Sequence, residues 1–421
     1  MGKVQNMKYD VAVIGLGYIG LPTASIFALK GLNVLGVDIR QDVVATINAG
    51  RIHIVEPELA TLVQSAVGSG HLRASTHYSP AHTFIIAVPT PFIHGDGQHR
   101  PDLTFVESAS RMAAPHVEQD TLVILESTSP VGTTEQVKAW VEEERSRLGL
   151  KPVHAHYAHC PERILPGQMI KELITNDRIC GGLTREAATK AKILYETFAS
   201  GTILVTDART AEMVKLTENA CRDVGIAFAN ELSMICDRLG LDVWEVIALA
   251  NHHPRVKILD PGPGVGGHCI AVDPWFIVDS APIESRLIRT AREVNDSKPQ
   301  FILEKVRSAA KGCSHKPTIA CLGLAFKANV DDLRESPSLA IATTLANEGF
   351  SLLLVEPYIK VLPAEIPPAN ARLVDIRTAL EAADIVVLLV NHREFLSVEM
   401  DSLKGKAVID TRGSWKSLRS S

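Results

Sequence analysis

A single cysteine follows a stretch that is almost free of side chains, in the segment PGPGVGGHCIAVDPWF at residues 261–276. Four glycines and two prolines precede Cys269, and Asp273 comes four residues after it. Glycines at this density allow a substrate carbon to come close to the sulfur. A cysteine thiolate is a strong nucleophile, and a nearby carboxylate can move a proton or orient water. A buried, inert cysteine in a sharp turn is the alternative. The segment favours covalent catalysis at Cys269.

A lysine and an amide are spaced for one face of a helix. Lys215 and Asn219 are four residues apart, and Arg222 is three residues further along, so a helix places all three on the same side. A lysine with an amide one turn away can stabilise a developing oxyanion or position a water molecule. A solvated polar stripe would show the same spacing.

A glycine pattern near the start of the chain predicts a dinucleotide site. GLGYIG contains Gly15, Gly17 and Gly20 between an apolar run and a helical pattern, and VLGVD ends at Asp38. The glycines let the backbone approach a pyrophosphate at a helix N-terminus, and the carboxylate binds the ribose hydroxyls. Asp38 favours NAD over NADP, although a nearby arginine can accept a 2′-phosphate. The remaining predicted cofactor contacts in these two segments are Tyr18, Ile19 and Arg40.

Polar groups also follow three other predicted strands. VPTP contains Thr90, ESTSP contains Thr128, and HAHYAHC is followed by Pro161 and then by Glu162 and Arg163. The carboxyl ends of strands face the ligand crevice in an open α/β sheet, so Thr90 and Thr128 are predicted to meet the cofactor. Glu162 is a candidate for acid–base chemistry and Arg163 for anion binding.

The three histidines of HAHYAHC do not predict a metal site. In a strand, His154 and His156 share one face and His159 points to the other. We therefore expect no metal there.

The elements that position these residues alternate between strands and helices. Apolar runs bounded by glycine or proline predict strands at residues 9–17, 33–39, 83–91 and 121–130, and again at 318–326, 351–357, 384–390 and 406–413. Between the two groups, residues 207–240 have helical periodicity without proline and apolar residues on several faces, which indicates burial on more than one side, including against another subunit. The predicted fold class is α/β, with two Rossmann-like doubly wound domains joined by a long central helix or helical domain. The predicted domains are residues 1–205, 206–300 and 301–421.

Composition excludes several classes of protein. The 421 residues are 46% hydrophobic and 22% charged, with a net charge of −5, which gives no signal for nucleic acid. The longest apolar runs are far too short to span a bilayer. Seven cysteines without a CxxC pair indicate neither a disulfide framework nor a zinc site. We expect a reduced, cytoplasmic setting.

Together these motifs resemble the UDP-glucose/GDP-mannose dehydrogenase family. The match runs from about Val11 to Arg412 and rests on GLGYIGLP, VPTP, ESTSPVGTT, CPERILPG, TAEMVKLTENACRD, GPGVGGHCIAVDPWF and GLAFKANVDDLRESPS. The UDP-glucose branch has serine and lysine where this chain has His268 and Val272. The sequence is more similar to the branch that oxidises UDP-N-acetyl-D-mannosamine. Ala328 replaces a usual proline, with little consequence expected, and we assign His268 no role.

The resemblance implies a double, NAD-dependent oxidation of a sugar C6 alcohol to a carboxylate. Cys269 would form a thiohemiacetal and then a thioester, and Lys215 and Asn219 would stabilise the oxyanions. Asp273, Glu162 and Thr128 would serve water or acid–base steps. The implied substrate contacts are Arg163, Ile164, Lys215, Asn219, Arg222, His253, Arg255, Gly266, Phe326, Lys327, Arg334 and Arg412. His253 and Arg255 match positions that can reach a neighbouring subunit, which implies a homodimer or larger homo-oligomer built on the long helix.

Three alternatives stay open at this point. UDP-N-acetyl-D-glucosamine differs from the expected substrate at one stereocentre. A two-electron hydroxyacid dehydrogenase of the 6-phosphogluconate type shares the glycine loop and long helices, but needs neither Cys269 nor the last α/β domain. A non-catalytic nucleotide-sugar sensor would not need to keep every candidate catalytic residue.

Overall fold

The fold is described from a computed structural model that covers residues 9–54, 56, 58–93, 99–164, 167–267 and 269–415. The chain divides into two compact units, Met1–Thr217 and Glu218–Ser421. Within the described residues, no helix is both long enough and apolar enough to cross a membrane. The predicted division into three domains stays a prediction.

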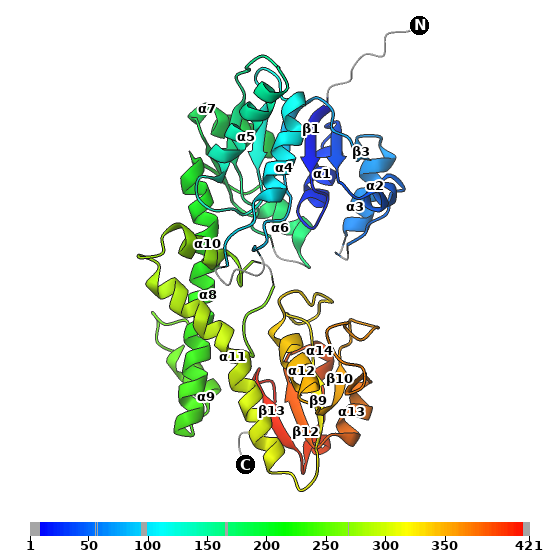
Figure 1. Ribbon diagram of the computed structural model, residues 1–421, viewed down its shortest axis with the longest axis vertical. Helices are drawn as coiled ribbons and strands as arrows, with labels where there is room; N and C mark the ends of the chain where they lie inside the picture. The colour runs from blue at the N-terminus through cyan, green and yellow to red at the C-terminus, as the bar shows by residue number, and fades with distance from the viewer. Residues whose placement is uncertain are drawn as a thin grey trace. The chain divides into compact units, whose positions relative to one another are not determined.

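The N-terminal unit is built on an eight-stranded sheet in the order β3-β2-β1-β4-β5-β6-β7-β8 (Figure 1). All neighbours are parallel except β6 and β7, which are antiparallel. The central strands are almost wholly buried, as expected for strands covered on both faces. The strands are β1 (Tyr9–Ile14), β2 (Val34–Val37), β3 (Leu72–Ser75), β4 (Ala81–Ile86), β5 (Leu122–Leu125), β6 (His156–His159), β7 (Arg178–Gly182) and β8 (Ile203–Asp207).

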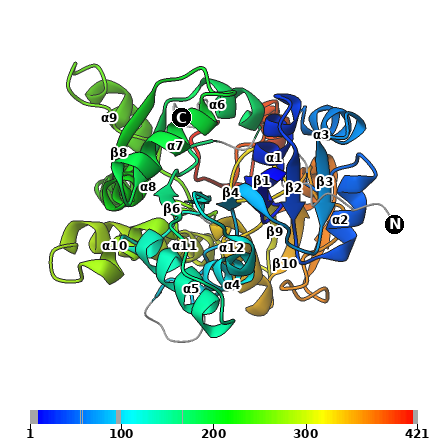
Figure 2. The same cartoon turned by 90° about the horizontal axis from the view of Figure 1, so that it is seen from above.

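Helices cover both faces of this sheet. One apolar core lies under α1, α2, α3, α6 and α7, and a second lies under α4 and α5; the view along the strands shows α1 and α7 on one side and α4 and α5 on the other (Figure 2). The bounds are α1 (Gly20–Leu29), α2 (Gln41–Asn48), α3 (Leu59–Gly68), α4 (Thr104–Ala113), α5 (Thr133–Arg147), α6 (Met169–Thr175) and α7 (Arg185–Tyr195), with a 3-10 turn η1 at Ala114–His116.

One long helix, α8 (Ala208–Leu239), runs from the end of the first unit into the second. It confirms the predicted helix at residues 207–240 to within one residue at each end. In the second unit it is followed by α9 (Val243–Ala250), α10 (Asp273–Ser280) and α11 (Arg286–Lys311). The loop with Cys269 lies between α9 and α10.

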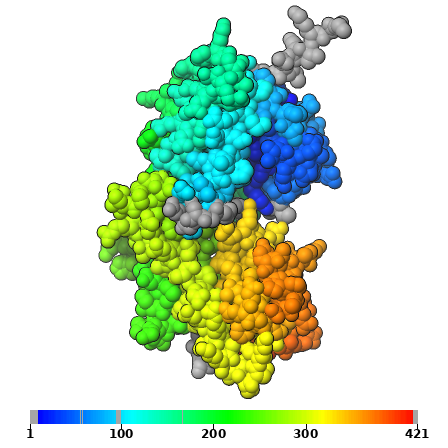
Figure 3. Space-filling view, in the orientation of Figure 1, coloured from blue at the N-terminus to red at the C-terminus, as the bar shows by residue number. Residues whose placement is uncertain are grey.

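The second unit also contains a five-stranded parallel sheet in the order β11-β10-β9-β12-β13. Helices α11 and α12 cover one face, while α13, α14 and the turn η2 cover the other. Helices α11 and α12 pack together, and their surfaces adjoin in Figure 3. The bounds are β9 (Thr318–Leu322), α12 (Pro337–Asn347), β10 (Ser351–Val355), β11 (Ala371–Leu373), α13 (Ile376–Ala382), β12 (Ile385–Leu388), α14 (Arg393–Leu396), η2 (Met400–Leu403) and β13 (Ala407–Asp410).

The predicted fold class is confirmed, because each unit has a doubly wound sheet and the long helix lies between the two sheets in the sequence. The eight apolar runs predicted as strands correspond to β1, β2, β4, β5, β9, β10, β12 and β13, and the strand expected before Glu162 corresponds to β6. One pair of strands differs from the rest, since β7 is antiparallel to β6.

Candidate active site

The glycine loop between β1 and α1 is held by the carboxylate at the end of β2. The backbone N–H of Leu16 donates to Asp38 Oδ2 at 3.1 Å, and the N–H of Arg40 donates to Oδ1 at 2.9 Å. Each carboxylate oxygen has a second lone pair for a ligand hydroxyl. The carboxylate predicted from sequence therefore lies against the loop that it was expected to serve.

Each of the three glycines in this loop is required for a different physical reason. Gly15 has φ of +90°, and a Cβ there would lie 2.6 Å from the Ala87 carbonyl oxygen. A Cβ on Gly20 would lie 1.8 Å from the Gly15 oxygen, so only glycine lets α1 begin this close to the loop. Apart from its chain neighbours, no atom of the described residues lies within 4 Å of a Cβ on Gly17, which leaves space for a pyrophosphate. Tyr18 and Ile19, the other predicted contacts in the loop, are half-buried.

The loops that end β4 and β5 are joined by side-chain hydrogen bonds. Thr90 Oγ1 donates to the Thr128 carbonyl at 2.7 Å, and Ser127 Oγ donates to the Val88 carbonyl at 2.7 Å. The two threonines predicted for the cofactor are therefore neighbours, as the strand-end rule indicates. Ser127 was not predicted, although it stands beside Thr128 in the same motif.

Beneath these strand ends is a buried charged cluster. Glu162 lies 2.6 Å from Arg178, and each side chain is about 5% exposed. Arg178 also stacks over the Tyr195 ring, at 4.7 Å from the ring centroid. The Tyr195 hydroxyl donates to Glu126 Oε1 at 3.0 Å. Burial, reinforced by the charge of Glu162, raises the pKa of Glu126 to about 8. Glu126 is therefore mostly protonated at neutral pH.

Of these residues, only Glu162 was predicted for the site. Its carboxylate accepts a hydrogen bond from the Arg163 backbone at 2.7 Å as well as the bond from Arg178. The Arg163 guanidinium donates to the Asp177 carbonyl, and Ile164 packs against the core of the unit. The roles expected for these three residues stay predictions.

Lys215 is half-buried on α8 and lies near His159, at the carboxyl end of β6. Burial, with a smaller contribution from the positive charge of Lys215, lowers the pKa of His159 to about 3. His159 is therefore neutral at physiological pH. Arg222, on the same helix, is exposed.

The cysteine loop brings together three of the predicted catalytic residues. Cys269 is exposed, and its carbonyl accepts the backbone N–H of Asp273 at 2.8 Å, at the start of α10. Asp273 is 3% exposed, and its Oδ2 accepts from Asn219 Nδ2 at 2.5 Å. The amide on α8 and the carboxylate one turn after the cysteine are therefore hydrogen-bonded partners. His268 lies outside the described residues.

The glycines of this loop are needed for packing against the second sheet's loops. A Cβ on Gly266 would lie 2.4 Å from the Glu335 oxygen, and one on Gly267 would lie 2.9 Å from the Phe326 ring. Gly264 has φ of +145°, which few other residues adopt. The sequence suggested room for a substrate, and the structure adds this second reason.

Two residues predicted to bind substrate, Phe326 and Arg412, lie against the same loop. A Cβ on Gly262 would lie 2.6 Å from Arg412 Nη1, and Arg412 Nε donates to the Leu389 carbonyl at 3.0 Å. Burial lowers the pKa of Arg412 to about 10, and the nearby Asp260 opposes this shift. Arg412 stays charged at neutral pH.

Four other residues predicted for the substrate, Lys327, Arg334, His253 and Arg255, are exposed. Arg334 forms an ion pair with Asp332 at 2.6 Å. His253 and Arg255 follow α9 and are exposed, with the Arg255 N–H donating to His253 Nδ1 at 3.3 Å.

A buried polar network that the sequence did not predict holds the two ends of the cysteine loop. At one end, the Gly262 N–H donates to Asn230 Oδ1 at 2.8 Å. At the other, Arg292 Nη1 donates to the Ile270 carbonyl at 3.3 Å and lies 2.5 Å from Asp223. Asn295 joins the two anchors, since it bonds to both Asn230 and Asp223.

The network therefore fixes the loop to α8 and α11. Burial raises the pKa of Asp223 to about 6, while the Arg292 guanidinium opposes the rise. Part of this network could have been predicted from the sequence, because Asp223 and Asn230 are seven residues apart and therefore lie on one face of the helix.

The fold and the glycine loop define the class: an α/β protein that binds a dinucleotide and carries an exposed cysteine beside an amide–carboxylate pair. Family models agree and are more specific. The UDP-glucose/GDP-mannose dehydrogenase family matches with its NAD binding domain over residues 9–199, its central domain over 209–297 and its UDP binding domain over 320–417. The chain belongs to this family, and its cofactor is NAD.

Individual relatives match nearly the whole chain. An NDP-N-acetyl-D-galactosaminuronic acid dehydrogenase from Ralstonia solanacearum is 56% identical over 415 residues, 97% of each chain. A UDP-N-acetyl-D-mannosamine dehydrogenase from Campylobacter jejuni is 56% identical over 94% of this chain and 99% of its own. The solved UDP-D-ManNAc dehydrogenase from Pyrococcus horikoshii has a TM-score of 0.86 and 40% identity, over 96% of both chains.

Proposed function

We propose that this protein oxidises the C6 alcohol of UDP-N-acetyl-D-mannosamine to the carboxylate, with NAD as the acceptor. The observation that carries the proposal is the hydrogen bond between Asn219 and Asp273 beside an exposed Cys269. A sugar-nucleotide dehydrogenase that stopped at the aldehyde would not need the thiol. The substrate is supported by relatives from Campylobacter jejuni and Escherichia coli, 56% and 52% identical, that are named for it.

The residues of the glycine loop fit NAD. Gly17 leaves open space where the pyrophosphate would lie, and Asp38 presents carboxylate oxygens for the ribose. Thr90 and Thr128 would meet the nicotinamide end. When bound, NAD accepts a hydride from the sugar carbon in each of the two oxidations.

In the proposed chemistry, Cys269 makes the second oxidation possible. An aldehyde carbon carries no hydroxyl proton for a repeat of the first step. Addition of the Cys269 thiolate forms a C–S bond and an oxyanion, giving a thiohemiacetal whose carbon can lose a hydride and become a thioester. Water then breaks the C–S bond, which gives the carboxylate and returns the thiol.

The other residues have proposed roles around these steps. Lys215 and Asn219, one turn apart on α8, donate to the oxyanions. Asp273, held by Asn219, orients or deprotonates the hydrolytic water. Glu162 and Thr128 are the remaining candidates for proton transfer and for holding water.

The assignment is tested with the purified chain, NAD and three sugar nucleotides: UDP-N-acetyl-D-mannosamine, UDP-N-acetyl-D-glucosamine and UDP-N-acetyl-D-galactosamine. We expect the mannosamine nucleotide to have the highest kcat/KM and to give two NADH per sugar oxidised. A higher kcat/KM with either other sugar would overturn the substrate. A ratio near one NADH would overturn the four-electron reaction and favour a two-electron dehydrogenase.

The variant Cys269→Ser tests the thiol directly. We expect it to abolish formation of the uronate while leaving NAD binding intact, measured by product chromatography and by calorimetry. Cys221→Ser is the matched control, since Cys221 is also exposed and has no proposed role. Full uronate production by Cys269→Ser would exclude a covalent intermediate on this residue.

A homodimer built on α8 is also part of the proposal. Three large apolar side chains of α8 are well exposed: Phe228 (55%), Ile235 (48%) and Leu239 (65%). The intervals between them are seven and four residues, so all three lie on one face of the helix. Large apolar side chains grouped in this way favour contact with a second copy of the chain. Light scattering of the wild type and of Leu239→Glu tests this, because a wild-type monomer would contradict it. The cytoplasmic location stays a prediction.

A further inference from the structure

A cluster of two histidines and two carboxylates lies at the amino-terminal edge of the first sheet. His156 begins β6, His154 precedes it by two residues, and Asp120 lies just before β5. Glu186 is in the first turn of α7. Because β5 and β6 are parallel, this edge is the one opposite the strand ends that carry Thr128 and Glu162. The proposed reaction uses none of the four residues.

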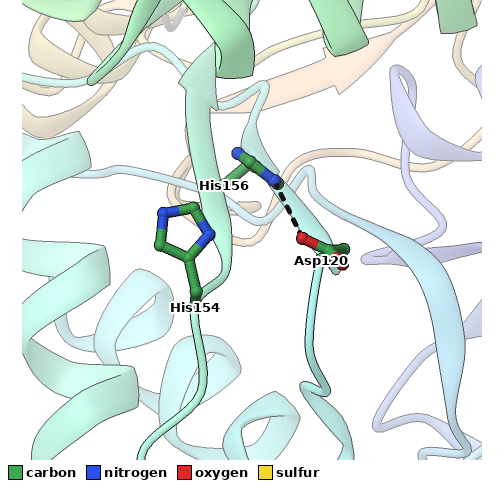
Figure 4. Close-up of side chains that lie close together, drawn as sticks. All are labelled: Asp120, His154 and His156. Carbon is green, nitrogen blue, oxygen red and sulfur yellow. Dashed lines mark ion pairs between the residues drawn. The ribbon is translucent and has the colours of Figure 1, made fainter.

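The side chains point toward one another. Ligand atoms of Asp120, His154 and His156 all lie within 4.8 Å of one another, and Figure 4 shows both imidazoles facing the carboxylate. His156 Nε2 lies 3.6 Å from Asp120 Oδ1 and 3.6 Å from Glu186 Oε1. These distances are longer than a hydrogen bond, and the buried His156 Nε2 has no hydrogen-bond partner among the described residues.

An unsatisfied imidazole nitrogen in a side chain only 1% exposed is costly unless something binds it. The 3.6 Å spacing agrees with a shared metal ion, since two ligands of a tetrahedral Zn²⁺ lie roughly 3.4 Å apart when each is about 2.1 Å from the metal. A bare ion pair with protonated His156 would instead bring the nitrogen within hydrogen-bond distance of one carboxylate. The set of two imidazoles and two carboxylates suits Zn²⁺ and related divalent transition metals.

We infer that Asp120, His154, His156 and Glu186 form a binding site for a divalent transition metal, with Zn²⁺ as the best match. His156 is the fixed ligand, because it is buried and its strand is held by the bond from its N–H to the Thr121 carbonyl at 2.8 Å. Asp120, His154 and Glu186 are exposed and adjust around the ion. The two carboxylates have only weak contacts with other polar side chains: Gln119 donates to Asp120 at 3.5 Å, and Lys190 lies 3.9 Å from Glu186.

No metal was predicted here from the sequence, because His159 was considered as the third ligand. His159 is fully buried on the opposite face of β6, as expected from strand alternation. Asp120 lies 34 residues before His154, and Glu186 lies 30 residues after His156, so sequence spacing alone does not reveal these two carboxylates. An ion at this site would fasten β5, β6 and α7 together at one edge of the sheet.

The test uses the full chain, freed of any affinity tag and treated with EDTA, and then dialysed against Zn²⁺. Bound metal is counted by mass spectrometry for the wild type, His154→Ala, Asp120→Asn and two controls. His154 and Asp120 are exposed, so the variants at these positions should fold. Asparagine also tolerates the φ of +63° at residue 120. His82→Ala is the matched control, an exposed histidine at the start of another strand of the same sheet. Cys269→Ser controls for zinc on the active-site thiol.

We expect the wild type, His82→Ala and Cys269→Ser to bind Zn²⁺ at this site. His154→Ala and Asp120→Asn should bind it at least about tenfold more weakly, since even indirect metal partners are worth that much. With Co²⁺ as the probe, the visible absorption of a four-coordinate ion should appear in the wild type and vanish in His154→Ala. Binding that is unchanged in His154→Ala and Asp120→Asn, or that is lost only in Cys269→Ser, would overturn the site, as would the absence of any bound metal.

Discussion

Replacing Glu126 by glutamine should remove a pH-dependent loss of stability. Glu126 is 2% exposed, and its pKa is raised from 4.5 to about 8, first by burial and then by the charge of Glu162. An acid with a raised pKa holds its proton more tightly when folded, so stability falls as pH rises from 4.5 towards 8 and levels off above that. Because one pKa unit corresponds to about 1.4 kcal/mol, the full loss is about 5 kcal/mol.

About half of that loss, on the order of 2–3 kcal/mol, falls between pH 6 and pH 9. Glutamine is neutral throughout, and its amide oxygen can still accept the hydrogen bond that Tyr195 donates to Glu126 at 3.0 Å. Urea unfolding at pH 6 and pH 9 should therefore show the wild type losing about 2–3 kcal/mol more stability than Glu126→Gln. Glu142→Gln, with a side chain 56% exposed, is the matched control and should follow the wild type. If Glu126→Gln loses as much stability as the wild type, Glu126 does not titrate in this range and the reasoning fails.

Two further predictions concern the loops that hold cofactor and thiol. Gly20→Ala places a Cβ 1.8 Å from the Gly15 oxygen and should cost about 1–3 kcal/mol of stability as well as NAD affinity. Gly17→Ala meets no protein atom and should lower NAD affinity alone, so equal melting temperatures for the two variants would contradict this steric account. Asn230→Ala leaves the buried Gly262 N–H without its acceptor, which costs about 1–3 kcal/mol. It should also lower kcat while the KM for NAD stays unchanged, and an unchanged kcat would show that the loop keeps its place without this anchor.

Strands with a strong apolar run could be predicted from the sequence, and short or mixed ones could not. The β4 segment ends in the apolar run FII and β12 is IVVL, whereas β3 is LRAS and β11 is ARL. Such short segments become strands only because a neighbouring strand supplies hydrogen bonds. The antiparallel direction of β7 depends likewise on the path of the chain between residues 159 and 178, which carries no local signal.

The same limit applies to the candidate site. Lys215 and Asn219 could be paired from helical spacing, and Asp38 and Thr128 from their places at strand ends. The bond between Asn219 and Asp273 joins residues 54 positions apart and requires the folded structure. In the sequence, Arg292 is one of many positively charged residues in a helical segment, yet its side chain is fully buried against Asp223. Buried polar pairs of this kind are determined by tertiary packing, so their residue types alone do not reveal them.

The anchored cysteine loop limits where substrate preference can change during evolution. Between its anchors at Gly262 and Ile270, the three glycines are confined by contacts with the loops of the second sheet or by a positive φ. If Cys269 is also fixed by its chemistry, few positions in the loop remain open to substitution, Val265 among them. Preference among sugar nucleotides that differ at one stereocentre would then have to be encoded mainly by residues outside the loop. Relatives could diverge in substrate while this segment hardly changes.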